Sequence, residues 1–415
     1  MIISICSFAL LAVVSIQTEA IKMGQPKVMS DLIARGDDSA QVPLPTDNFT
    51  VHDPAAVFSN GHYYLFAGST KGVGIPYYRS QKDSLTGPWN SLGQVLPGGS
   101  KISEQGEDSQ KPWAPAVVIQ DNTMYVFYAV TIPSSMKSAI GVATTTTPDD
   151  ATSWTDHGAI MYTGQGPNTN LWPFNITNAI DPSILIDTAN NSQPILQYGS
   201  YYGGIIQLPL SPTLLSLVNP HPPFSALRVA YSPAPATPRT LGAHPIEGSF
   251  LSYHSPYYYL WYAHGLCCGF SPSTVSSLPL SSIYEIRIGR STVRSGPFLD
   301  QQGRDLNDGG GTTILSSHGN VFAPGGPGVL KAPNGGDILY YHFLPRDGNL
   351  TNESAELGWN PLGYGDDGWP VLSSEFEEGR DPSTRSGVPS RAGSSGIDWG
   401  PVMVMALAPF VIMFY

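Results

Sequence analysis

The sequence is poor in cysteine, in charge and in basic residues. With three cysteines among 415 residues, disulfide bonds do not hold the fold together, and the core has to be stabilised by packing. Charged residues make up 13% and hydrophobic residues 41% of the chain, which excludes an intrinsically disordered protein. The 20 lysines and arginines face 32 acidic residues, and no basic run occurs. Because phosphate binding requires a basic face, the net charge of -12 argues against nucleic acid and favours a neutral ligand.

Long amphipathic helical patterns are also missing, while turn formers and aromatic residues are abundant. The chain contains 44 glycines, 38 prolines and 21 tyrosines, which favours many turns and short, half-buried strands. Five aromatic, β-branched segments recur, each preceded by a second strand-like run. They are residues 62–69, 123–130, 194–202, 257–264 and 337–343. Hairpins without helices are typical of a sandwich, a barrel or a propeller, and the long period favours four-stranded blades. The sequence therefore predicts an all-β, single-domain, five-bladed β-propeller over residues 47–375.

Three acidic residues stand where such hairpins begin. Asp53 and Asp181 each form an Asp-Pro pair before a strand-like run, and Glu247 holds the equivalent place in the fourth unit. The first strand of each propeller blade lines the central channel, so we expect these carboxyl groups to meet at one mouth. Like charges at short range push pKa values apart, and glycoside hydrolysis needs one protonated and one ionised carboxyl group. The residues alone do not divide the roles between the two aspartates.

The segments around these acids carry a family resemblance. VHDPAAVF (51–58), NAIDPSILI (178–186) and HPIEGSFL (244–251) resemble the signature segments of glycoside hydrolase family 43, and within it those of the endo-1,5-α-L-arabinanases. Further segments agree in order and spacing, from about residue 50 to 373. They are PWAPAVV (112–118), AIGVAT (139–144), LQYGSYYGGI (196–205), LCCG (266–269), IRIGRSTVRSGPFLD (286–300), GGGTTILSSHGNVFAPGGPG (309–328) and DGWPVL (367–372).

The resemblance implies an inverting hydrolase that cleaves internal bonds of arabinan, the pectin side chain, as a monomer and without a cofactor for the chemistry. Asp53 would be the general base, Glu247 the general acid, and Asp181 the residue that modulates the pKa of the acid and orients it. The alternatives are an exo-acting α-L-arabinofuranosidase or β-xylosidase of the same family, and a carbohydrate-binding propeller that does not cut. Ala116 departs from the family pattern, which often has an acid there.

The resemblance also assigns residues around the three acids. The implied substrate-binding residues are His52, Trp113, Asn178, Ser200 and Tyr201. Each has a plainer structural interpretation, such as a packed histidine or a core tryptophan. His318 resembles the histidine that holds a calcium-type ion together with water molecules near the propeller axis of arabinanases.

Both termini carry segments that are typical of export signals. Residues 1–20 are interpreted as a signal peptide, with an N-terminal membrane anchor or buried helix as the alternative, and residues 21–46 as an N-terminal arm. Residues 376–396 form a linker rich in small residues, with a candidate attachment site near Gly393 or Ser394. Residues 397–415 form a hydrophobic tail typical of a GPI-anchor signal, with a plain tail helix as the alternative. We expect an extracellular protein that meets a membrane only through this anchor.

Export agrees with the remaining motifs. Five sequons mark candidate glycosylation sites at Asn48, Asn175, Asn190, Asn349 and Asn352. Cys6 lies in the signal peptide, which leaves the adjacent Cys267 and Cys268 either as a vicinal disulfide or reduced.

Overall fold

The computed structural model describes residues 43–373, except for short gaps. The gaps are residues 45, 47–48, 69–72, 103–110, 133–134, 188–191, 220–221, 223, 234–244, 272–274 and 276–277. The chain divides into the units Met1–Phe376 and Glu377–Tyr415, and every described residue belongs to the first. The predicted signal peptide, linker and hydrophobic tail, and nearly all of the arm, lie outside the described residues. None of the helices in the described part is long and apolar enough to cross a membrane.

Five antiparallel sheets of four strands, called blades 1 to 5, make up the fold. Blade 1 consists of β1 (Ala55–Ser59), β2 (His62–Phe66), β3 (Ile75–Ser80) and β4 (Trp89–Val95). Blade 2 consists of β5 (Trp113–Gln120), β6 (Thr123–Thr131), β7 (Ser138–Thr145) and β8 (Thr155–Thr163). Blade 3 consists of β9 (Ser183–Leu185), β10 (Ile195–Ser200), β11 (Gly204–Pro209) and β12 (Leu227–Ala230). Blade 4 consists of β13 (Ile246–His254), β14 (Tyr257–His264), β15 (Glu285–Ser291) and β16 (Thr312–Leu315). Blade 5 consists of β17 (Val321–Lys331), β18 (Asp337–Pro345), β19 (Glu356–Tyr364) and β20 (Pro370–Leu372).

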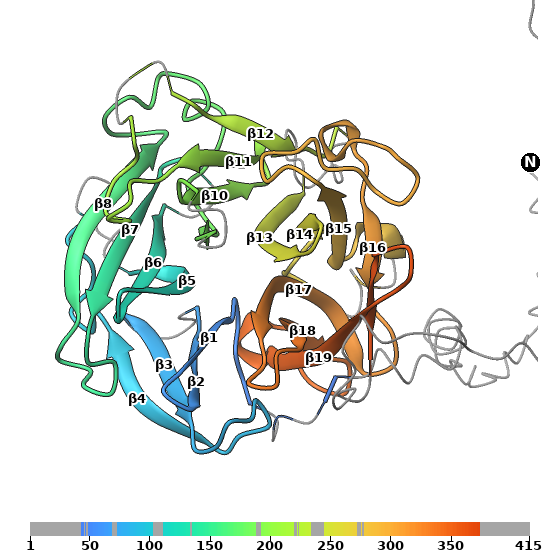
Figure 1. Ribbon diagram of the computed structural model, residues 1–415, viewed down its shortest axis with the longest axis horizontal. Helices are drawn as coiled ribbons and strands as arrows, with labels where there is room; N and C mark the ends of the chain where they lie inside the picture. Colours follow the sequence, from blue (N-terminus) through green and yellow to red (C-terminus); the bar gives the residue numbers. More distant parts are fainter. Residues whose placement is uncertain are drawn as a thin grey trace, which may run out of the picture. The chain divides into compact units, whose positions relative to one another are not determined.

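The blades follow one another around a central axis, and β1, β5, β13 and β17 lie innermost (Figure 1). Short 3-10 helices occur only between strands in the described part, as η4 (Leu280–Ser282), η5 (Leu306–Asp308) and η6 (Asn352–Ser354). The predicted all-β, five-bladed propeller is confirmed.

The second strand of a blade is buried on both faces, which explains its continuous aromatic sequence. In β18 every residue is buried. Ile338 and Tyr340 pack in one apolar cluster with blade 1, whereas Leu339 and Tyr341 pack in another with blade 4. Alternate side chains of a strand point to opposite faces, so one run of apolar residues serves two interfaces. The hydrophobic core therefore lies between the blades.

The segment before β1 closes the ring against blade 5. The backbone N–H of Val51 donates to the carbonyl of Ala355 at 2.8 Å, and that of Leu357 donates to the carbonyl of Phe49 at 2.9 Å. These bonds join residues about 300 positions apart in a chain whose two ends would otherwise leave open sheet edges. They also fix the position of the next residues, His52 and Asp53.

A channel of about 840 Å³ runs between the five innermost strands. All five innermost strands have the same backbone conformation where they begin to line the channel. One residue there has left-handed backbone angles, and the next residue is proline in four blades and serine in blade 4. The left-handed residues are Asp53 (φ 47°), Ala114 (46°), Asp181 (51°), Gly248 (57°) and Gly326 (58°). A positive φ is unfavourable for residues other than glycine and recurs at functional sites. Thus the paired Asp-Pro motifs place two carboxyl groups at equivalent points of the channel.

Candidate active site

The structure brings Asp53, Asp181 and Glu247 together at the start of the innermost strands of blades 1, 3 and 4. Asp53 and Asp181 line the channel, and Glu247 is the second residue of β13. The backbone N–H of Gly248, directly after the glutamate, donates to Oδ2 of Asp181 at 3.0 Å. This bond ties blade 3 to the strand that carries Glu247. The convergence that the sequence predicted is therefore present in the fold. The prediction that Glu247 holds the place equivalent to Asp53 and Asp181 was wrong by one residue, because Gly248 occupies that left-handed position and Glu247 precedes it.

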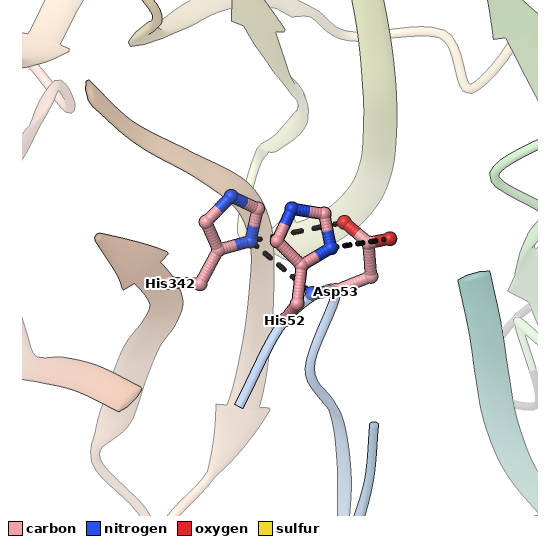
Figure 2. A group of neighbouring side chains, drawn as sticks. All are labelled: His52, Asp53 and His342. Atoms are coloured by element: carbon pink, nitrogen blue, oxygen red, sulfur yellow. Dashed lines mark hydrogen bonds and ion pairs between the residues drawn. The ribbon is translucent and has the colours of Figure 1, made fainter. Parts of the chain in front are cut away.

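Asp53 lies beside two histidines (Figure 2). Nδ1 of His52 is 3.0 Å from Oδ2 of Asp53, and the backbone N–H of Asp53 donates to Nδ1 of His342 at 3.2 Å. The two imidazole rings stack with 4.4 Å between their centroids. Gly326 leaves room for this pair, since a Cβ at that position would lie 3.0 Å from Nδ1 of His342.

These contacts favour an ionised Asp53. Burial acts to raise the pKa of its carboxyl group, but the charge of His52, its hydrogen bond and His342 outweigh burial, so the pKa is lowered. Burial alone would lower the pKa of His52, whereas the charge of Asp53 raises it overall. Burial and the charge of His52 lower the pKa of His342 to about 3. His342 is therefore neutral at ordinary pH, and its unprotonated Nδ1 accepts the bond from Asp53.

Glu247 has the opposite environment. Burial raises the pKa of its carboxyl group well above the usual value, and the negative charges of Asp181 and Asp53 raise it further. The hydroxyl of Tyr284 donates to Oε1 of Glu247 at 3.0 Å, which acts in the other direction. The net effect is a raised pKa, which favours the protonated form of Glu247.

Asp181 lies in the same electrostatic environment as Glu247. Burial and the charge of Asp53 raise its pKa to about 8, against the opposing effects of the Gly248 N–H and the charge of His52. Asp181 and Glu247 therefore compete for protons while Asp53 stays ionised. The environment distinguishes the two aspartates, which the residue pattern alone did not.

The structure places the other predicted substrate-binding residues in different surroundings. Trp113 begins β5 and packs, partly buried, against Ala114, Ala129 and Ile180. Asn178 is buried three residues before Asp181, and its Oδ1 has no hydrogen-bond partner. A buried acceptor without a protein partner is suited to a ligand hydroxyl.

The other two predicted substrate-binding residues, Ser200 and Tyr201, belong to blade 3. Ser200 ends β10. The hydroxyl of Tyr201 donates to the carbonyl of Gly265 at 2.9 Å and accepts from the N–H of Cys267 at 3.3 Å. The hydroxyl of Tyr201 is thus hydrogen-bonded to the loop that follows β14 in blade 4. Its pKa is raised well above the usual value by burial and by the charge of Glu247.

His318 is not a member of the group of metal-type side chains that the described part of the chain brings together. Its Nδ1 is 2.8 Å from the carbonyl of Ser316. Within the described residues, the group of histidine, cysteine and acidic side chains close enough to hold an ion is His52, Asp53 and His342. Calcium prefers oxygen ligands, and Nδ1 of His342 already accepts the Asp53 N–H.

The remaining predicted modification sites are placed as follows. Asn175 and Asn349 are exposed and Asn352 is half-buried, while Asn48 and Asn190 lie outside the described residues. Cys267 and Cys268 are joined by a disulfide bond, which resolves the alternative that the sequence left open.

The sequence did not indicate two residues of the site, His342 and Tyr284. His342 stands in an aromatic strand segment, where a histidine is normally a packed core residue. Tyr284 precedes β15 without any motif of its own. Ring closure brings His342 of blade 5 to Asp53 of blade 1. The Tyr284–Glu247 contact forms within blade 4, between residues 37 positions apart.

The profile of the glycosyl hydrolases family 43 matches residues 43–370. The chain belongs to this family of glycoside hydrolases, as the resemblance implied. A protein of Emericella nidulans named probable arabinan endo-1,5-alpha-L-arabinosidase D is 43% identical, over 81% of this chain and 84% of that protein. Arabinan endo-1,5-alpha-L-arabinosidase A of Aspergillus niger is 38% identical, over 78% of this chain and 91% of its own length.

Solved structures agree with the fold. The endo-arabinanase of Bacillus licheniformis superposes with a TM-score of 0.62 at 26% identity, over 80% of this chain and 99% of that one. The Cellvibrio cellulosa alpha-L-arabinanase complexed with arabinohexaose has a TM-score of 0.62 at 25% identity, with 78% and 95% covered. An exo-1,5-alpha-L-arabinanase from a bovine ruminal metagenomic library matches equally well, with a TM-score of 0.62.

Proposed function

We propose that this protein is an endo-acting glycoside hydrolase that cleaves internal α-1,5-L-arabinofuranosidic bonds of arabinan with inversion. The observation that carries the proposal is the opposite perturbation of two carboxyl groups at one channel mouth. The pKa of Asp53 is lowered and that of Glu247 is raised, which is the division that general acid–base catalysis requires. The relatives named arabinan endo-1,5-alpha-L-arabinosidases support the substrate class.

Each carboxyl group then has one task. Asp53 removes a proton from a water molecule, which attacks the anomeric carbon from the face opposite the leaving group. Glu247 donates its proton to the glycosidic oxygen as the bond to that carbon breaks, so both products are neutral sugars. Afterwards Asp53 has gained the proton that Glu247 lost, and exchange with solvent restores the pair. Inversion follows from this single displacement.

Asp181 acts on the acid rather than on the sugar in this proposal. Once it ionises, above its pKa of about 8, its negative charge raises the pKa of Glu247. Its Oδ2 accepts the N–H of Gly248 and thereby fixes the backbone next to the acid. His52 and His342 perform the corresponding task for Asp53, by keeping the carboxylate ionised and by holding its backbone.

Two alternatives remain distinct from this proposal. An exo-acting arabinofuranosidase would use the same residues, and the structural likeness to an exo-1,5-alpha-L-arabinanase keeps it in the comparison. A β-xylosidase would do so as well. A propeller that only binds sugars is disfavoured, because a binder has no use for a like-charge trio with opposed protonation.

We further propose that the protein is exported as a monomeric glycoprotein and retained by a GPI anchor. The proposal is supported by the apolar runs in residues 1–20 and 397–415, which are typical of export and GPI-anchor signals. The exposure of Asn175 and Asn349 supports the glycans. Release from cells by a phosphatidylinositol-specific phospholipase, and a mass loss with an endoglycosidase, test these points. Release by salt alone would contradict the anchor, and an unchanged mass would contradict the glycans.

A calcium-type ion held mainly by water near His318 also stays a proposal, supported by the family resemblance. No catalytic step is assigned to it. Elemental analysis of the dialysed protein beside a His318→Ala variant tests it. Equal calcium content in both would contradict a site at His318.

The central experiment is product analysis on linear α-1,5-arabinan, with arabinoxylan and xylobiose as control substrates. The protein produced from the full chain runs beside its Glu247→Gln variant. A ladder of short arabino-oligosaccharides that the variant does not produce supports endo action with Glu247 as the acid. Free arabinose or xylose as the only product supports the exo alternative. Binding without any product would mean that the carboxyl groups hold a sugar and do not cut it.

A further inference from the structure

The carboxyl group of Glu247 has one side-chain hydrogen bond in the described structure, and its donor is a tyrosine that the sequence motifs do not mark. Tyr284 precedes β15, and its hydroxyl donates to Oε1 of Glu247 at 3.0 Å. Both residues are buried, and both belong to blade 4. The bond spans 37 positions of the sequence and no motif marks it.

The ring of Tyr284 is fixed by the neighbouring blade. It lies directly on Gly325 of β17, where a Cβ would come within 1.8 Å of Cε1 of the tyrosine. The imidazole of His342 stacks nearby with 6.1 Å between ring centroids. Ala263, Ile283 and Phe322 belong to the same apolar cluster. A ring enclosed in this way cannot turn its hydroxyl elsewhere, so the donor stays aimed at Glu247.

The chemistry of this donor is also constrained. Burial and the charge of Glu247 raise the pKa of the Tyr284 hydroxyl well above its usual value, so the group remains protonated and keeps the hydrogen that it donates to Oε1. A donated bond occupies Oε1, and the proton of the acid then resides on Oε2. Such a bond also stabilises the carboxylate that remains after the proton has been transferred.

We propose that Tyr284 is a positioning residue for the general acid: its hydroxyl occupies Oε1 of Glu247, so that Oε2 presents the proton to the leaving oxygen and the resulting carboxylate is stabilised. This inference rests on the proposed function, because it takes Glu247 as the acid. It assigns to Tyr284 a share in leaving-group departure and none in substrate binding.

The test uses a Tyr284→Phe variant and a matched control. Tyr262→Phe removes a buried tyrosine hydroxyl of the same blade, whose 2.8 Å bond goes to the carbonyl of Gly310 instead of the acid. Both variants and Glu247→Gln are assayed on linear arabinan. They are also assayed on an aryl arabino-oligosaccharide with a 4-nitrophenolate leaving group, which departs without a proton. Circular dichroism and thermal melting verify that each variant is folded.

We expect Tyr284→Phe to lose activity on arabinan and to keep activity on the aryl substrate. A hydrogen bond to a charged group contributes a factor of about 10 to 100, so kcat of Tyr284→Phe on arabinan falls by that factor with KM nearly unchanged. The rate on the aryl substrate stays within about threefold of the parent, because that leaving group needs no acid. Loss of the donor raises the pKa of Glu247, so the alkaline limb of kcat/KM moves to higher pH. Tyr262→Phe shows none of these changes.

Three outcomes would overturn the proposal. An unchanged kcat on arabinan with an unmoved alkaline limb would remove any role of Tyr284 in the acid step. An equal loss on both substrates would indicate a merely structural role. If Glu247→Gln itself keeps full activity on arabinan, the acid assignment fails, and that failure is visible independently of the tyrosine variant.

Discussion

The neutral imidazole of His342 accepts the backbone N–H of Asp53 at 3.2 Å across 289 positions of the sequence. One hydrogen bond therefore joins the first and last blades at the proposed base. Blade closure and catalysis depend on the same contact, because the ring has to close before Asp53 acquires its partner.

Replacement of His342 by alanine tests this dependence. The buried N–H of Asp53 loses its acceptor, which costs about 1 to 3 kcal/mol of folding free energy, and the base loses its fixed position. We expect a lower melting temperature and a kcat reduced by about 100-fold, the order of effect of a misplaced catalytic group. His157→Ala is the control, since His157 is exposed and its ring hydrogen-bonds to Thr144 at 2.8 Å. Equal melting temperatures and rates for both variants would contradict the account.

The charge of His52 should set the acid limb of the pH profile. Its ion pair with Asp53 lowers the pKa of the carboxyl group, so the parent enzyme keeps an ionised base below the usual range of aspartate. His52→Gln removes the positive charge and raises that pKa, and the acid limb of kcat/KM moves to higher pH. His254→Gln breaks a similar pair with Asp337 and should leave the limb in place. A limb that stays fixed in His52→Gln would mean that another group titrates there.

Asp181→Asn should move the alkaline limb of the pH profile of kcat/KM. Above its pKa of about 8 Asp181 is ionised, and its negative charge then raises the pKa of Glu247. Loss of this charge lowers the pKa of Glu247, so the alkaline limb shifts to lower pH. Asparagine keeps an oxygen that can accept the Gly248 N–H, which separates the charge effect from the backbone contact. Asp181→Ala removes both and should reduce kcat further. The pH dependence of kcat/KM for both variants measures this, and an alkaline limb at the parent position in Asp181→Asn would refute it.

Gly325 should not tolerate a side chain. An added Cβ would lie 1.8 Å from the Tyr284 ring, so Gly325→Ala forces the ring or the strand to move. Overpacking of this kind costs about 3 kcal/mol or more, which chemical denaturation would measure. Gly98→Ala serves as the control, because no atom lies within 4 Å of a Cβ at that position. Equal free energies of unfolding for the two variants would show that the structure around Gly325 can accommodate a methyl group, contrary to the account.

The fold and the three acids were predictable because both leave local patterns in the sequence. The doubly buried second strands require continuous aromatic runs, as in β18, and the recurring left-handed residue before proline marks Asp53 and Asp181. The family resemblance supplied the role of each acid.

The partners of the acids were not predictable in the same way. His342 and Tyr284 reach Asp53 and Glu247 only through contacts between blades or across a long loop. The His342 contact depends on how blade 5 packs against blade 1, and the Tyr284 contact joins residues 37 positions apart, so no local pattern encodes either one. The division between the two aspartates likewise depends on which one lies beside His52.

The stereochemistry of the first product tests the central claim most directly. Proton NMR of early hydrolysis of an α-1,5-linked arabino-oligosaccharide distinguishes the two anomers before they equilibrate. A base at Asp53 and an acid at Glu247 predict that the β-anomer is formed first, by direct attack of water. An α-anomer formed first would require a covalent intermediate on one carboxyl group and would contradict the account.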